Sequence, residues 1–149
     1  MFVRRIIFSV VVVLILIQFY PVDTINPKET APIQMTDSVS SLIENACYDC
    51  HSNNTKWPWY TNIAPISWFL LDHVNEGRRE LNFSEWNSYS VPRMKRKLQE
   101  IVEEVEQDKM PLKDYKMMHP EAELLPKDKE KLIRWAKAYA DSLVIHSNE

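Results

Sequence analysis

The sequence contains almost no glycine and very little cysteine. Gly77 is the single glycine among 149 residues, which excludes glycine-rich phosphate loops and dinucleotide fingerprints, because those motifs need several glycines close together. A lone glycine can permit a close backbone approach or end a helix. Only two cysteines are present, Cys47 and Cys50, and cysteines this close in sequence cannot join distant segments as a disulfide framework does.

Strand signals and excess positive charge are also missing. No segment shows sustained alternation of apolar and polar residues, so the sequence predicts an all-α fold. The 18 basic and 21 acidic residues give a formal net charge of −3. This balance argues against nucleic acid as a partner, because phosphate binding needs clustered positive charge. No Ser/His/Asp arrangement or carboxylate pair is legible, and we therefore predict a protein that is not an enzyme.

Residues 1–22 differ in kind from the rest of the chain. Arg4 and Arg5 precede an apolar run from Ile6 to Val22, a pattern typical of a secretory signal or signal anchor. The run has about the minimum length for a membrane span, which needs about 17–25 apolar residues. No small-residue cleavage site follows, which favours an uncleaved, single-pass transmembrane helix over a cleaved signal and secretion to the periplasm. The two arginines predict that the rest of the chain faces the periplasm.

The remainder divides into a linker and one domain. Residues 23–35 are polar and contain two prolines, which is typical of an extended linker. We expect one domain over residues 36–149, with an irregular segment at 108–124. Apolar spacing and helix-start signals predict helices from about residue 37 to Cys50, from Pro65 to near Asn82, from Ser90 to Gln107 and from Pro126 to about Ile145.

The segment Cys47-Tyr48-Asp49-Cys50-His51 has the form C-x-x-C-H, the attachment signature of c-type haem. Near the end of a helix, cysteines three apart lie on one face and can reach both vinyl groups of a porphyrin edge. The adjoining His51 then lies under the ring and can ligate the iron. The motif therefore predicts one covalently bound haem c.

Three other interpretations of this motif remain open. A redox dithiol is expected near a βαβ pattern, and no strand is evident. Structural zinc needs four ligands, so a further side chain would have to join Cys47, Cys50 and His51. The two thiols can also be simply unreactive.

The surrounding sequence resembles the haem-binding domain family, small exported proteins related to monohaem cytochromes c and common in Bacteroidetes-type bacteria. The resemblance covers about Val39 to Tyr139. It rests on four blocks in order: C-x-x-C-H-S-N, W-P-W-Y, H-V-x-x-G-R-x-x-L-N-F-S-x-W and M-P…Y…H-P-E-A. It implies a small cytochrome c-like helical haem domain behind the N-terminal transmembrane helix, and it leaves the physiological reaction open.

Met110 is the first candidate for the iron ligand opposite His51. Pro111 follows it, as a proline often follows the distal methionine of cytochromes c, and a thioether ligand raises the reduction potential. Met110 can equally be a core residue. His73 is the second candidate, although a lone histidine in a helix is more often a packed core residue. His119 and the adjacent Met117 and Met118 also remain candidates.

Arg78 is a candidate for bidentate hydrogen bonds to haem propionates, and the alternative is a position on a solvated helix face.

The leading hypothesis is electron transfer by a membrane-tethered monohaem cytochrome that meets a redox partner protein. The alternatives are a haem-based sensor or ligand-binding module and a haem-bearing accessory subunit of a membrane oxidoreductase.

Overall fold

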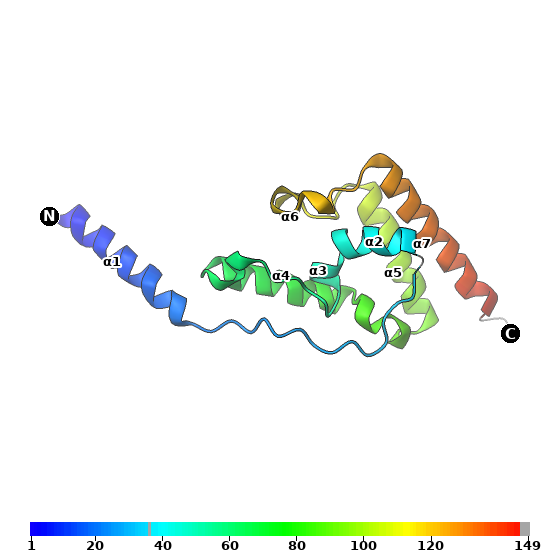
Figure 1. Ribbon diagram of the computed structural model, residues 1–149, viewed down its shortest axis with the longest axis horizontal. Helices are drawn as coiled ribbons and strands as arrows, with labels where there is room; N and C mark the ends of the chain where they lie inside the picture. Colours follow the sequence, from blue (N-terminus) through cyan, green and yellow to red (C-terminus); the bar gives the residue numbers. More distant parts are fainter. Residues whose placement is uncertain (36, 147–149) are drawn as a thin grey trace.

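The computed structural model describes residues 1–35 and 37–146, and within them the chain is 70% helical with no strand. The prediction of an all-α fold with one apolar N-terminal helix is thereby confirmed (Figure 1). The elements in chain order are α1 (Phe2–Leu16), η1 (Ile17–Phe19), α2 (Asp37–Ala46), α3 (Tyr48–His51), η2 (Trp59–Asn62), α4 (Ile66–Glu80), η3 (Phe83–Ser88), α5 (Val91–Glu106), α6 (Lys113–Met118), η4 (Pro120–Ala122) and α7 (Pro126–His146). Here η denotes a 3₁₀ turn.

Two segments differ from the sequence prediction. The helix expected to run through Cys50 is interrupted at Cys47, whose backbone (φ −128°, ψ −33°) leaves the helical region between α2 and α3. The segment expected to be irregular contains the six-residue helix α6 and the turn η4. A helix this short shows too few apolar repeats for its periodicity to be recognised, and its contacts with distant residues stabilise it instead.

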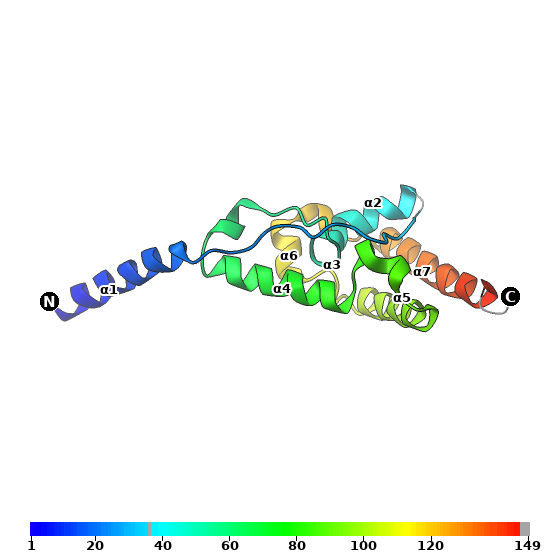
Figure 2. The same ribbon diagram turned by 90° about the horizontal axis from the view of Figure 1, so that it is seen from below.

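The core lies between α5, α7, α2 and η3. Helices α5 and α7 run side by side at the C-terminal end of the molecule (Figures 1 and 2). Trp86 of η3 is completely buried, and its indole Nε1 donates a hydrogen bond to the hydroxyl of Tyr139 (3.0 Å). The buried apolar residues that meet here include Val39, Ile43, Phe83, Met94, Leu98, Val102, Val105, Leu132 and Ala136.

The N-terminal helix projects away from this core (Figure 1). The stretch Phe2–Phe19 has a mean hydropathy of 2.3, and none of it is buried within the described structure. By length and composition this helix could cross a membrane. Residues 20–35 continue from it as an extended segment along the domain (Figure 2).

The later half of this extended segment is packed on the domain. The backbone amide of Ile33 donates a hydrogen bond to the carbonyl oxygen of Phe83 (2.9 Å). The backbone amide of Ala31 donates one to the carbonyl oxygen of Ser84 (3.0 Å). The Ile33 side chain is part of the core. The proposed division into residues 1–22, 23–35 and 36–149 stays a prediction, and residues 36 and 147–149 of that domain lie outside the described residues.

The packing of α7 on α5 generates a stability prediction. Leu132 on α7 is 1% exposed, and replacing it by alanine should lower the free energy of unfolding by about 2–5 kcal/mol through lost burial and a cavity. Arg134→Ala on the solvent side of α7 is the matched control, expected within about 0.5 kcal/mol of wild type. Urea unfolding of the full chain in detergent measures both, and equal midpoints for the two variants would contradict the assigned core.

Candidate functional site

The C-x-x-C-H segment lies at the junction of two cavities. Each has a volume of about 330 Å³, at the lower end of the range of about 300–1,000 Å³ typical of ligand and cofactor sites. Both are lined by Ala46, Cys47, His51, Glu80 and Met110. The first cavity also has Cys50, His73 and Tyr115 in its wall, and the second has Leu81, Phe83, Lys97, Ile101 and Val105.

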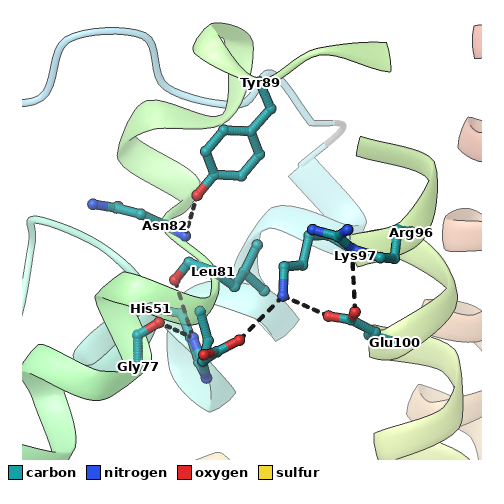
Figure 3. Close-up of polar contacts among 9 residues, drawn as sticks. His51, Gly77, Leu81, Asn82, Tyr89, Arg96, Lys97 and Glu100 are labelled. Atoms are coloured by element: carbon teal, nitrogen blue, oxygen red, sulfur yellow. Dashed lines mark hydrogen bonds and ion pairs between the residues drawn. The ribbon is translucent and has the colours of Figure 1, made fainter. Parts of the chain in front are cut away.

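The ring of His51 is fixed by the C-terminal end of α4. Its Nδ1 lies 2.9 Å from the carbonyl oxygen of Gly77 and 3.1 Å from that of Leu81 (Figure 3). Carbonyl oxygens only accept hydrogen bonds, so Nδ1 carries the proton. Burial lowers the pKa of His51, which favours the neutral ring. Nε2 is then unprotonated, and it has no hydrogen bond to any described residue.

Gly77 allows α3 to approach α4 this closely. A Cβ atom added at Gly77 would lie 2.5 Å from the carbonyl oxygen of Cys50 and 3.1 Å from its Cβ. Backbone atoms cannot yield as a flexible side chain can, so any larger residue would force α3 away from α4. The single glycine is therefore required for a close approach, the first of the two roles that the sequence allowed.

The two cysteine sulfurs are free thiols in this structure. Burial, with the neighbouring Cys50 as a smaller cause, raises the pKa of Cys47 to about 12. Burial and the adjacent Asp49 raise the pKa of Cys50 to about 11. Reactive dithiols have lowered pKa values instead, so the redox-dithiol interpretation gains no support. Among the described residues no group of three or more His, Cys, Asp or Glu side chains is placed to hold a metal ion.

Buried hydrogen bonds hold the residues that follow His51. The Ser52 hydroxyl donates to the Tyr48 carbonyl (2.8 Å), and the Asn53 amide donates to the Ser84 hydroxyl (2.9 Å). The side-chain amide of Asn82 in turn donates to Oδ1 of Asn53 (2.9 Å). Because these polar groups are buried and paired, this loop is fixed against η3.

Arg78 takes part in this scaffold and does not line either cavity. Its Nε donates to the carbonyl of Ser52 (2.9 Å). Its Nη2 donates to Oδ1 of Asn26 and to the Thr55 hydroxyl, both at 2.9 Å. The propionate contact expected for Arg78 stays a prediction, and the geometry favours a role in fixing the loop.

The candidate distal ligands lie at different places. Met110 lines both cavities, and His73 lines only the first, where its Nδ1 is 3.1 Å from the carbonyl of Phe69. His119 lines neither of the two. Its Nε2 is 2.8 Å from the Tyr60 hydroxyl, and its Nδ1 is 3.1 Å from a carboxylate oxygen of Glu121.

Two residues of the site had no role assigned to them from the sequence. Lys97 is 6% exposed, and its Nζ lies 2.6 Å from Glu100 and 3.3 Å from Glu80 at the wall of the second cavity (Figure 3). Its position between Met94 and Leu98, on the border of the apolar stripe, was the available signal. Tyr115 of α6 is the tyrosine of the block M-P…Y…H-P-E-A. Its hydroxyl donates to Oδ2 of Asp49 (2.7 Å), a long-range contact that no local pattern predicts.

The contact at Gly77 generates a second prediction. In a solvated helix Gly→Ala stabilises by up to about 1 kcal/mol, but Gly77→Ala should destabilise by about 1–3 kcal/mol because the added Cβ collides with backbone. Asn75→Ala on the exposed part of α4 is the control and should leave stability within about 0.5 kcal/mol of wild type. Thermal and urea unfolding measure the difference; a stabilised Gly77→Ala protein would show that α3 does not lie against α4.

A family model described as a haem-binding domain matches residues 12–138, from the apolar helix to the last helix. No curated protein and no solved structure matches the chain. The match covers most of the sequence and includes every residue of the site described above. This chain therefore belongs to the haem-binding domain family.

Proposed function

We propose that this chain holds one haem c, linked covalently through Cys47 and Cys50 with His51 as the proximal ligand, and that it carries electrons. Haem binding itself follows from membership of the family. Bound haem supplies an iron atom that alternates between two oxidation states. The observation that carries the proposal is the state of His51. Two carbonyls hold its Nδ1 proton, its Nε2 has no hydrogen bond to a described residue, and the residue lines one cavity together with Cys47 and Cys50.

The proximal assignment rests on a common arrangement of metal-binding histidines. Such a histidine usually donates its other ring N–H to a carbonyl or carboxylate, which fixes the tautomer and raises the basicity of the ligating nitrogen. The carbonyls of Gly77 and Leu81 fill this role for His51.

Met110 is the distal ligand that this geometry favours. It belongs to the segment between α5 and α6, and it lines both cavities together with His51. His73 lies on α4, the same helix that holds His51 from its Nδ1 side. Ligation of the iron by His119 would require the loss of its contacts with Tyr60 and Glu121. A methionine ligand stabilises the ferrous state and suits an electron carrier.

The proposed location follows from α1. We propose that this helix anchors the chain in the cytoplasmic membrane, with Arg4 and Arg5 inside and the haem domain in the periplasm. The domain would then meet a redox partner protein at the membrane. If α1 is instead cleaved, the same domain is a soluble periplasmic carrier, and N-terminal sequencing of the native protein distinguishes the two.

Covalent attachment is tested by replacing both cysteines. Cys47→Ala/Cys50→Ala should lose all haem staining on a denaturing gel, because no thioether remains. Tyr48→Phe changes a variable position of the same motif, and Tyr48 has no side-chain hydrogen bond among the described residues, so this control should stain as wild type does. Unstained wild-type protein, matured in an export-competent host, with two alkylatable thiols would reject the proposal.

The sixth ligand is tested by optical spectroscopy. Met110→Ala should convert a low-spin spectrum into a high-spin or carbon monoxide-binding one, because the iron loses its thioether ligand. His73→Ala and His119→Ala should leave the spin state unchanged. A spectral change in His73→Ala alone would assign the ligand to α4. Ready binding of carbon monoxide by the wild-type protein would favour the sensor function instead of the carrier.

A further inference from the structure

We propose that the domain end nearest to α1 sits in the lipid headgroup layer on the periplasmic side of the membrane. This end, here called the apolar end, consists of Trp59, Ile63, Ile66, Trp68 and Phe69 from η2 and the start of α4. The inference rests on the proposed function in one respect, since it takes α1 as a membrane span. It adds a second membrane contact, made by the folded domain itself.

The composition and exposure of the apolar end are those of a membrane-facing surface. The Trp59 side chain is 73% exposed, that of Phe69 is 67% exposed, and that of Ile66 is 49% exposed. No charged residue occurs from Trp57 to Leu71 in the sequence. Grouped exposed apolar side chains on a folded domain mark a site of interaction with protein or membrane.

Direct contacts join the apolar end to the end of the span. The side-chain amide of Gln18 donates to the carbonyl of Ala64 (3.0 Å), and the Ala64 amide donates to Oε1 of Gln18 (3.0 Å). The ring of Tyr20 packs edge-on against Trp68 with 5.9 Å between centroids. If the apolar stretch up to Phe19 lies in the hydrocarbon core of a bilayer, the lipid headgroups therefore lie at the level of Ala64 and the residues around it.

The residue types select lipid over another protein as the occupant. Tryptophan and tyrosine concentrate at the headgroup level of membranes, where an amphipathic ring contacts both acyl chains and water. Tyr20 and Trp68 supply such rings in contact with each other. The exposed Trp59 on η2 adds another ring, and Ile63, Ile66 and Phe69 add exposed apolar side chains at and after η2. The surface is thus continuous with the apolar surface of α1.

Contact of the apolar end with the headgroup layer would set the distance between the membrane and the haem site. Helix α4 runs from the apolar end toward α3, with its N-terminal end nearest α1 in both views (Figures 1 and 2). From Ile66 to Gly77 the axial distance is about 16 Å at about 1.5 Å per residue. The apolar end would therefore rest on lipid while the cavities beside Gly77 stay clear of it and open to a partner.

The test uses the full chain, labelled with 5-fluorotryptophan and reconstituted in phosphatidylcholine/phosphatidylglycerol nanodiscs. Fluorine NMR signals are recorded after reduction with dithionite, with and without lipid that carries a gadolinium chelate on its headgroup, a relaxation agent that dithionite does not reduce. We expect the Trp59 and Trp68 signals to lose most of their intensity. Trp86 in the core and Trp135 on α7 should keep theirs and serve as internal controls.

Introducing a charge at this surface distinguishes insertion of the apolar end into the headgroup layer from tethering by α1 alone. Phe69→Glu places a charge on an exposed position of the apolar end and should restore much of the Trp59 signal. Ala138→Glu makes the same change on the exposed side of α7, away from α1, and should have no effect. Both positions are exposed, so neither change removes a core contact.

The inference is overturned if Trp59 loses as much signal in Phe69→Glu as in the wild type. It is also overturned if the Trp59 signal of the wild type loses no more intensity than the Trp135 signal. A concentration-dependent dimer with an unattenuated Trp59 would assign the surface to a second copy of the chain and would also overturn it. Haem staining of the same samples is an independent readout. Colourless protein with an attenuated Trp59 would reject the haem c proposal and leave the membrane seating intact.

Discussion

The hydrogen bonds from the His51 ring to the carbonyls at the end of α4 are the constraint on which the rest of the site depends. They need the ring close to the helix end, which in turn needs Gly77, since any side chain there would collide with the backbone of Cys50. One contact thereby sets the tautomer of the histidine, the direction of its free nitrogen and the placement of the neighbouring sulfurs. A family defined by haem binding would use such a constraint to keep its proximal side rigid.

The polar network behind the motif explains how a four-residue helix is held in place. Asn53, Asn82 and Ser84 form buried hydrogen bonds, and the extended N-terminal segment joins them through the Lys28 carbonyl and the Glu29 carboxylate. Buried polar groups are costly when unpaired and specific when paired. The segment between the apolar helix and the domain is therefore a structural part of the haem-binding unit, and truncation before residue 30 would remove partners from this network.

The elements follow one another along the long axis of the molecule: α1, the start of α4, α3 and then α5 and α7 (Figures 1 and 2). In this order the core of α5 and α7 lies far from α1, and α4 connects the end near α1 with the site. The aromatic residues accordingly divide into two groups. Phe83, Trp86 and Tyr139 pack in or against the core, and Trp68 packs against Tyr20, which follows the apolar helix.

The sequence by itself determined the all-α class, the apolar helix, most helix positions and the C-x-x-C-H segment, because periodicity and a five-residue motif depend only on near neighbours. It did not foresee the break at Cys47, the helix α6 or the buried Lys97. These features depend on partners many residues away, such as Glu80 for Lys97. Only the tertiary structure brings those partners within hydrogen-bonding distance, and so only it decided the tautomer of His51 and the reason for the single glycine.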